Sequence, residues 1–458
     1  MPTPRPTIHW VSPLPPAQTD IAHYTTRVLP ALSAKAEVIL WTDADFWDPK
    51  LDRLCAVKHF DPDTISPRDF TAARHGTGPE MIFIHIGNSW VYHAGFMRLA
   101  LRLPSVIVLH DLAIQELMLE AVEHSEWEAN TYLAGMSKWY GAEGIRVAKT
   151  CLDKEKKGTE ISSAMPGFEL VLERARAVLT HTDVAHDAVT TRIPHLPCLL
   201  LPLPFEIGSE PPKNRPRFGP LRLLQFGWIG PNRRLEHVLD ALAELGNDLD
   251  YKFDIMGKIW NPDIIYDKIV ALNLEHRVHL HGFVSEAVLD DALRQSHLVF
   301  NLRHPSMGEA SGSQLRIWNA GAASVVTREG WYAGLPEDVA YIIDLEDEAA
   351  QLYALLKALA IDRGKTASMG RAGRAYLEAH HTPEAYAEAL VALVYRTVAD
   401  ARSQLNQHSS ERLERRGPMS ERQQLNLLRL SVESYVKCQA PAFRSHAGSR
   451  LDRRIGTE

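Results

Sequence analysis

Cysteine is scarce in this sequence. The 458 residues include four cysteines, which lie far apart and without any CxxC pair, at Cys55, Cys151, Cys198 and Cys438. Disulfide frameworks and cysteine-based zinc sites both require a denser spacing of cysteines. The spacing therefore favours a reducing compartment, and we expect a cytoplasmic protein.

Long apolar runs are missing as well. Residues 1–6 read MPTPRP and do not begin a secretory signal, which needs an apolar segment after a basic start. Nowhere does an apolar stretch reach the length that a membrane-spanning helix needs. We expect no span. A peripheral contact between the arginine-containing end of the chain and the inner face of a membrane stays open.

Neither a surplus of positive charge nor a metal motif is present. The 50 Lys and Arg residues against 57 Asp and Glu residues give a net charge of −7, whereas nucleic-acid-binding proteins normally carry a basic surplus. The 21 histidines include no HExxH or comparable zinc spacing. We therefore expect no nucleic-acid partner, no metal and no other cofactor.

The chain does contain two series of short apolar runs separated by helical patterns. Such runs, bounded by polar or turn residues, are typical of parallel strands that helices cover on both faces. Strands are predicted at 8–14, 37–41, 81–86, 105–109 and 177–180, and again at 221–226, 252–256, 278–280, 298–302, 324–327 and 341–344. Helices are predicted at 114–133, 167–176, 235–245, 287–295 and 315–320.

A proline-rich stretch separates the two series, and prolines there disfavour both helix and central strand. Two βα series predict an α/β protein with two Rossmann-like, doubly wound parallel-sheet domains facing a central cleft. The predicted parts are a first domain (1–205), a linker (206–220), a second domain (221–382), a crossover helix (383–404), and an appended helix with a loosely ordered tail (405–458, with helical spacing at 425–436).

The strongest local signal lies where the second series begins. Gly227 follows the first strand of that series, and Arg233 and Arg234 stand where a helix is expected to start. Unpaired backbone N–H groups and the helix dipole favour anions at such a start, and guanidinium groups match phosphate oxygens. Arginines without a ligand would oppose the dipole. The pattern predicts a diphosphate site.

A second signal follows the predicted strand 298–302. Glu309 precedes four small residues, Ala310, Ser311, Gly312 and Ser313, and small residues let a ligand approach the backbone closely. The carboxylate is suited to accept hydrogen bonds from sugar hydroxyl groups, and Ser313 is expected to cap the next helix. The alternative is a polar capping loop without a ligand.

In the first half, His110 and Asp111 follow the wholly apolar strand 105–109. Ligand contacts in α/β folds lie at the carboxyl ends of strands. Asp20 either caps a helix or contacts a substrate. The acceptor-side candidates of this half, with His110, are Thr19, Asp20, Gly87, Asn88 and Asp111.

In order and spacing these features resemble glycosyltransferase family 4, a group of retaining enzymes with the GT-B fold. The matching motifs are the SPLPP loop at 12–16, HD at 110–111, FG at 226–227 with Arg233, and GEASGS at 308–313. Weaker matches are HGFV at 281–284 and GWYAGLP at 330–336. The resemblance covers about residues 8–400.

The resemblance implies a nucleotide-sugar donor and a role for each matching residue. Gly227 and Arg233 match the diphosphate-binding positions, Glu309 matches a glutamate that contacts the donor sugar, and His110 matches a histidine that faces the hexose. We take His110, Arg233 and Glu309 as the expected catalytic residues. The other expected donor contacts are Arg234, Ala310, Ser311, Gly312 and Ser313, with Phe283 and Val284 at the nucleobase.

Three positions depart from the family pattern. Ile317 stands where the family has a second glutamate that holds the ribose, as in a subset that also reads Glu-Ala-Ser-Gly-Ser. Trp228 replaces an arginine after the diphosphate glycine, and Arg234 is expected to compensate. Thr19 and Asp20 occupy a loop in which a flexible glycine is common.

The implied activity is retaining transfer of a hexose to a saccharide or lipid-linked acceptor, in polysaccharide or glycolipid synthesis. Asp43-Ala44-Asp45 has the DxD form that chelates a metal in the other main transferase fold, but it lies far along the chain from the phosphate features, and we interpret it as a structural cap. A nucleotide-sugar 2-epimerase and a non-catalytic GT-B subunit stay open as alternatives. The oligomeric state is not predicted.

Overall fold

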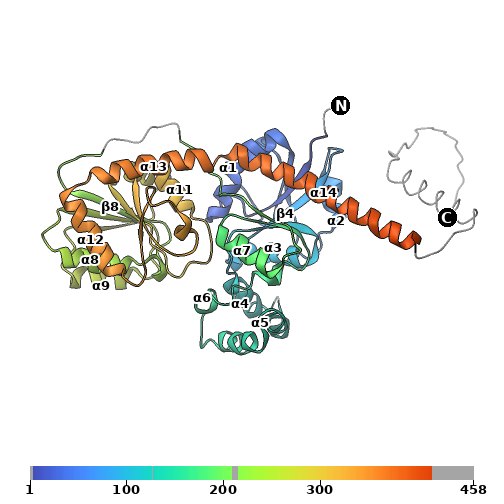
Figure 1. The fold of residues 1–458 in the computed structure, drawn as a ribbon, viewed down its shortest axis with the longest axis horizontal. Helices are drawn as coiled ribbons and strands as arrows, with labels where there is room; N and C mark the ends of the chain where they lie inside the picture. Colours follow the sequence, from blue (N-terminus) through green and yellow to red (C-terminus); the bar gives the residue numbers. More distant parts are fainter. Residues whose placement is uncertain (1–3, 126, 209–214, 415–458) are drawn as a thin grey trace, which may run out of the picture. The chain divides into compact units, whose positions relative to one another are not determined.

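The structure is a computed structural model and describes residues 4–125, 127–208 and 215–414. The chain divides into two compact units after Thr397. Two parallel β-sheets with flanking helices lie in the first unit (Figure 1). We call them, with their helices, the first sheet domain (4–205) and the second sheet domain (221–382).

The first sheet has seven parallel strands in the order β3-β2-β1-β4-β5-β6-β7. In the inner strand β5, Val106 and Val108 pack on one face and Ile107 packs on the other. A strand covered on both faces buries every side chain, which explains why apolar residues follow Ser105 without interruption. The strands are β1 (Thr7–Val11), β2 (Glu37–Thr42), β3 (Ala56–His59), β4 (Glu80–Ile86), β5 (Ser105–Leu109), β6 (Ala175–Thr180) and β7 (Cys198–Leu200).

Helices and short 3-10 turns connect these strands. A helical insertion, α4 to α6, separates β5 from β6. Inside α5, Gly141 has a φ of +68° and interrupts the helix. The elements are α1 (Asp20–Lys35), η1 (Leu51–Arg53), α2 (Pro67–Ala73), α3 (Trp90–Arg102), α4 (Gln115–Glu123), α5 (Ala129–Leu152), α6 (Gly158–Ile161), η2 (Phe168–Val171) and α7 (Asp183–Arg192).

The second sheet has six parallel strands in the order β10-β9-β8-β11-β12-β13. Leu223 and Leu224, neighbours in β8, point into two different apolar clusters on opposite faces. The strands are β8 (Leu221–Phe226), β9 (Tyr251–Met256), β10 (Val278–Gly282), β11 (Leu298–Phe300), β12 (Ala323–Thr327) and β13 (Tyr341–Ile343). The helices are η3 (Pro231–Arg233), α8 (Leu235–Leu245), α9 (Pro262–Ala271), α10 (Glu286–Gln295), α11 (Gly312–Asn319), η4 (Gly330–Gly334), α12 (Glu348–Ile361) and α13 (Gly364–His380).

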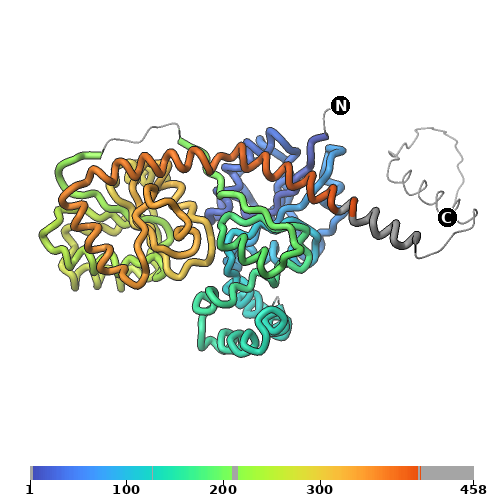
Figure 2. Tube along the Cα trace, in the orientation of Figure 1, coloured from blue at the N-terminus to red at the C-terminus, as the bar shows by residue number. Residues whose placement is uncertain are grey.

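Helix α14 (Pro383–Glu414) returns from the second sheet domain to the first (Figure 2). The Tyr386 hydroxyl lies 2.5 Å from the Tyr24 hydroxyl, and Lys35 donates to Glu388 over 2.8 Å. The helix continues past the predicted crossover segment into residues 405–414. The rest of the predicted tail, 415–458 with its helical segment at 425–436, and residues 209–214 of the predicted linker lie outside the described residues.

The two doubly wound parallel sheets confirm the predicted fold class, but four local predictions were wrong. Residues 167–176 are not a helix: only η2 is helical, and β6 already begins at Ala175. The predicted helix 114–133 is two helices, because α4 ends at Glu123 and α5 begins at Ala129. The outer strands β3 and β7 were missed, since both are short and neither is buried. Ser311, not Ser313, caps α11, and its hydroxyl accepts from the Gln314 N–H.

No helix in the described part of the chain is both long and apolar enough to cross a membrane.

Candidate functional site

The predicted donor-side residues gather at the carboxyl ends of the second sheet. Gly227, directly after β8, has a φ of +97°, a conformation that glycine adopts at little cost. Its carbonyl oxygen lies 2.0 Å from where a Cβ at Gly257 would stand. Glycine at 257 therefore lets the loops after β8 and β9 run close together.

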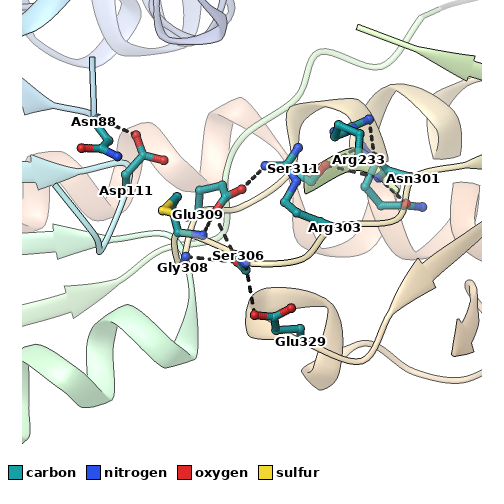
Figure 3. Close-up of polar contacts among 12 residues, drawn as sticks. Asn88, Asp111, Arg233, Asn301, Arg303, Ser306, Gly308, Glu309, Ser311 and Glu329 are labelled. Carbon is teal, nitrogen blue, oxygen red and sulfur yellow. Dashed lines mark hydrogen bonds and ion pairs between the residues drawn. The ribbon is translucent and has the colours of Figure 1, made fainter. Parts of the chain in front are cut away.

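Arg233 is a buried cation at this edge. Only 4% of the residue is exposed, and its guanidinium donates to the Asn301 Oδ1 over 3.0 Å and to the Phe226 carbonyl over 3.3 Å (Figure 3). Burial, and secondarily the charge of Arg303, lowers the pKa of Arg233 to about 10, so the group stays protonated at neutral pH. Its Nε has no hydrogen-bond partner among the described residues. A buried charge that meets only neutral acceptors is suited to bind an anion.

Arg234 has a different environment from Arg233, its neighbour in sequence. It has a φ of +57°, and its side chain pairs with Glu348 at the start of α12, with Nε 3.0 Å from Oε2. Its charge is therefore already neutralised. The expected compensation for Trp228 by Arg234 has no support in this geometry.

Asn301 and Gln314 hold Arg233 in place, and the sequence prediction missed both. Neither side chain is exposed. The Asn301 amide donates to Gln314 Oε1 over 3.0 Å, and Gln314 donates to the Ser324 hydroxyl over 2.7 Å. Buried hydrogen bonds of this kind fix the positions of the side chains that form them. The available signal was Asn301 itself, a polar residue at the end of an apolar strand.

Glu309 lies in the loop between β11 and α11, as expected. Its carboxylate accepts from the Met307 N–H over 2.7 Å and from the Ser306 hydroxyl over 3.2 Å, and it pairs with Arg303 (Figure 3). The prediction did not include Arg303, whose Nε has no partner among the described residues. Arg303 is the residue that places a second guanidinium near Arg233.

The same loop contacts the first sheet domain. Gly308 has a φ of +76°, and a Cβ at this position would stand 2.6 Å from the Leu112 Cβ. The Thr182 hydroxyl donates to the Gly308 carbonyl over 2.9 Å, and the Ala113 N–H donates to the Met307 carbonyl over 2.9 Å. These contacts bring the carboxyl end of β5 to the Glu309 loop.

On the first sheet domain, Asn88 and Asp111 meet. The Asn88 N–H donates to Asp111 Oδ2 over 2.8 Å, and the Asn88 side chain accepts from the Leu117 N–H over 3.2 Å. Burial raises the pKa of Asp111. A Cβ at Gly87 would stand 2.9 Å from His93 Nε2, so only glycine fits between these groups.

The structure excludes one of the two interpretations of Asp20. Thr19 is the N-cap of α1, and its hydroxyl accepts from the Ile21 N–H. Asp20 is therefore not the cap. Its Oδ2 lies 3.6 Å from where a Cβ at Gly312 would stand, so this carboxylate faces the beginning of α11.

The other residues that the sequence analysis singled out lie apart from one another, in both sheet domains. The Phe283 side chain is largely exposed, and Val284 packs against an apolar cluster. Ile317 is wholly buried in that cluster and cannot contact a ribose. Asp43 of the DxD motif lies against α3, where a Cβ at Gly95 would stand 2.2 Å from its carboxylate. Across the described residues, no group of three or more His, Cys, Asp or Glu side chains is arranged to hold a metal ion.

A hollow of about 730 Å³ lies elsewhere in the first sheet domain, between α5 and α7. Its buried carboxylate, Glu169, accepts from the Tyr140 hydroxyl over 2.5 Å and from Arg192 over 2.8 Å. The charge of Glu169 is therefore matched, unlike that of Arg233. For this reason we place the candidate site at the carboxyl ends of the sheets rather than in the hollow.

The chain is similar to known glycosyltransferases in part of its sequence and in its fold. Residues 233–392 match the family model described as glycosyl transferase-like, and no curated protein sequence matches the chain significantly. HepE of Anabaena, solved with UDP, has a TM-score of 0.53, is 15% identical, and is matched over 87% of this chain and 100% of its own. The fold is GT-B.

Two further GT-B structures agree. Sucrose-phosphate synthase of Thermosynechococcus elongatus has a TM-score of 0.56 at 16% identity over 87% of this chain and 100% of its own. A glycosyltransferase of Rickettsia africae has a TM-score of 0.57 at 9% identity over 86% of this chain and 99% of its own. Within this fold the chain brings together Arg233, Arg303 and Glu309 on the second sheet domain. Arg234 is paired with Glu348 instead, and Asp43 packs against α3.

Proposed function

We propose that this protein is a glycosyltransferase that moves a hexose from a nucleoside-diphosphate sugar to an acceptor hydroxyl, with retention at the anomeric carbon. One observation supports it most: Arg233 is a buried cation that pairs with no carboxylate of the described residues, at the edge of a GT-B sheet. A diphosphate supplies the missing negative charge.

The leaving diphosphate is the main electrostatic demand of this reaction. Negative charge grows on its oxygens as the bond to the sugar breaks, and preorganised donors stabilise that charge without reorganisation. Arg233 and the N–H groups at the start of α11 are the donors in position, and Arg303 joins them when the donor sugar takes over its present partner Glu309. We propose that they act without a metal, because two guanidinium groups take over its electrostatic role.

The remaining expected residues complete the proposed donor site. Glu309 is oriented to accept hydrogen bonds from sugar hydroxyl groups once a donor competes with its present partners. Phe283, exposed at the end of β10, is suited to stack on a nucleobase. With Ile317 in the core, the ribose contact falls to another residue.

In the proposed reaction the acceptor oxygen forms a bond to the anomeric carbon while the bond from that carbon to the phosphate oxygen breaks. The departing phosphate takes the acceptor proton, so no protein nucleophile is needed. At the carboxyl ends of the first sheet, Asp20, Asn88 and Asp111 face the acceptor, and His110 faces the transferred hexose. Saccharides and lipid-linked saccharides are the acceptor classes we propose, in polysaccharide or glycolipid synthesis.

Nucleotide binding tests the proposal directly. A thermal-shift panel of UDP, GDP, ADP and dTDP, followed by their hexose conjugates, identifies the donor because a bound ligand raises the melting temperature with affinity. UDP comes first, because HepE, which shares the fold, was crystallised with UDP and UDP-glucose. Conversion of the donor to its 2-epimer without an acceptor would instead indicate an epimerase, and no nucleotide binding at all would indicate a non-catalytic subunit.

A further inference from the structure

A cluster of four histidines lies under the acceptor side of the site. His110 is partly exposed at the end of β5, while His85 of β4, His93 of α3 and His181 after β6 are between 0% and 4% exposed. Aromatic rings of α1 and β1 enclose the cluster. The Trp10 ring centroid lies 4.3 Å from that of His85, and the Tyr24 centroid lies 5.0 Å from that of His110. The cluster is therefore a dry, closely packed environment.

Within the cluster, His85 and His110 share a hydrogen bond. His85 Nδ1 lies 2.9 Å from His110 Nε2, and the two rings stack at 30° with centroids 5.2 Å apart. His85 Nε2 is buried and has no partner among the described residues. His110 Nδ1 forms no hydrogen bond with the described residues and is not among their completely buried polar atoms. It is the ring nitrogen of His110 that remains open to a ligand.

Two proton arrangements satisfy the shared bond. If His110 donates from Nε2, His85 must carry its own proton on Nε2, which leaves a buried N–H without an acceptor. If His85 donates from Nδ1, its Nε2 is a bare lone pair and no buried N–H is orphaned. Orphaned buried N–H groups are rarer than unused acceptors. The second arrangement is therefore favoured.

The neighbouring histidines, like His85 and His110, are neutral. His93 Nδ1 lies 3.0 Å from the His85 carbonyl, and His181 Nδ1 lies 3.0 Å from the Leu201 carbonyl. A carbonyl only accepts, so both Nδ1 atoms carry protons. Burial lowers the pKa of His93 and of His181 to about 4, and it places those of His85 and His110 well below the ordinary value. The cluster is neutral at physiological pH, and tautomers decide its hydrogen bonds.

We propose that His85 is a positioning residue that fixes His110 in the tautomer with its proton on Nδ1, so that His110 donates a hydrogen bond to an oxygen of the transferred sugar. This rests on the proposed function for the identity of the ligand. In this tautomer the open nitrogen has no lone pair, so His110 does not accept the acceptor's proton. That fits a reaction in which the departing phosphate takes it.

The test is ¹⁵N NMR of the full chain, labelled at histidine and recorded without nucleotide or sugar. The ring nitrogens of His110 are assigned by their loss in His110→Asn. We expect Nδ1 protonated and Nε2 bare in the wild type. A protonated Nε2 in the wild type overturns the proposal, and this measurement needs no variant to fold.

Substitutions at His85 then test the cause. His85→Leu removes the donor, and we expect the His110 nitrogens to become averaged between two tautomers. His85→Asn restores an amide donor at the same place and should restore the bare Nε2. The matched control is His93→Asn, whose amide nitrogen takes the place of Nδ1 as the donor to the His85 carbonyl and which should leave His110 unchanged.

A His110 tautomer that is unchanged in a folded His85→Leu protein would show that His85 does not set it. Because this measurement uses no ligand, that result would say nothing about nucleotide binding by Arg233, which the thermal-shift panel tests separately. Conversely, a chain that binds no nucleotide but shows the expected tautomer would contradict both the sugar contact and the proposed function. Only the hydrogen bond between His85 and His110 would then stand.

Discussion

The two sheet domains bury ionisable groups at the same site with opposite results. On the first, burial leaves His85 and His110 neutral, because an imidazole pKa that starts near 6.5 has only a short distance to fall below physiological pH. On the second, burial lowers the pKa of Arg233 only to about 10, which leaves the charge in place. Desolvation is the same in kind. The starting pKa decides whether a buried group becomes a neutral hydrogen-bond donor or an unpaired cation.

The division matches what the proposed reaction requires of each side. A diphosphate needs permanent positive charge, and a guanidinium keeps its charge when buried. Hydroxyl groups of a hexose need donors and acceptors without net charge, which neutral histidines provide. Five predictions test this comparison and are given in order of decreasing expected effect.

Removing the charge of Arg233 should have the largest effect. We expect Arg233→Met to lower kcat about 10²–10³-fold, the range seen when one preorganised donor to a developing oxyanion is lost. Steady-state kinetics with the identified donor measure it. Arg328→Ala, which breaks an exposed ion pair with Asp344 in the same domain, is the control and should turn over normally. Near-normal transfer by Arg233→Met would rule out the diphosphate assignment.

Giving Arg233 a carboxylate partner should abolish its difference from Arg234. Asn301→Asp places a negative charge at the atom that now lies 3.0 Å from the guanidinium. We expect diphosphate affinity to fall about 10–100-fold, from the 1.5–3 kcal/mol of a hydrogen bond to a charged group. Isothermal titration measures the affinity, and a thermal melt checks the fold. Unchanged affinity in a folded variant would mean that the ligand does not need this charge.

The histidine side should make stability depend on pH. An unfolded chain protonates His93 below its ordinary pKa of 6.5, whereas the folded chain does so only near pH 4. The free energy of unfolding is therefore highest above pH 6.5. It decreases as the pH falls toward 4, by about 2 kcal/mol between pH 7 and pH 5. Over this interval we expect the free energy of unfolding of His93→Gln, measured by urea titration, to fall by about 2 kcal/mol less than that of the wild type. Equal losses would contradict a neutral buried His93. Arg233 stays protonated throughout and contributes nothing to the slope.

The corrected cap of α11 gives a smaller effect. Ser311→Ala should lower the free energy of unfolding by about 1 kcal/mol, because the Gln314 N–H loses its acceptor. Ser313→Ala lies inside the helix and should change it little. Paired urea titrations compare the two, and an equal or reversed order would restore Ser313 as the cap.

Removal of divalent metal should have no effect at all. Two arginines provide the proposed charge stabilisation, so transfer is expected to continue unchanged in excess EDTA. The assay adds EDTA and then Mn²⁺ to the same enzyme. A loss of activity that Mn²⁺ restores would return attention to Asp43 and Asp45.

Much of the fold was predictable, and the misses have local causes. Buried strands such as β5 and β8 consist mainly of Val, Ile and Leu, so composition alone marks them. The outer strands β3 and β7 carry few buried side chains and look like loops. The predicted helix at 167–176 failed because apolar spacing in a short window fits a 3-10 turn followed by a strand as well as it fits a helix.

The site was predictable as a set of positions and not as a set of contacts. The sequence alone determined that Gly227, Arg233, Glu309 and His110 follow strands, because parallel strands end at one edge of a sheet. Only the tertiary structure decided that Arg233 is buried away from every carboxylate in the described part of the chain, while Arg234 pairs with Glu348 from a distant helix. It also decided that His85 lies behind His110. Periodicity reports which face a residue occupies, whereas its partner depends on packing between segments far apart in the chain.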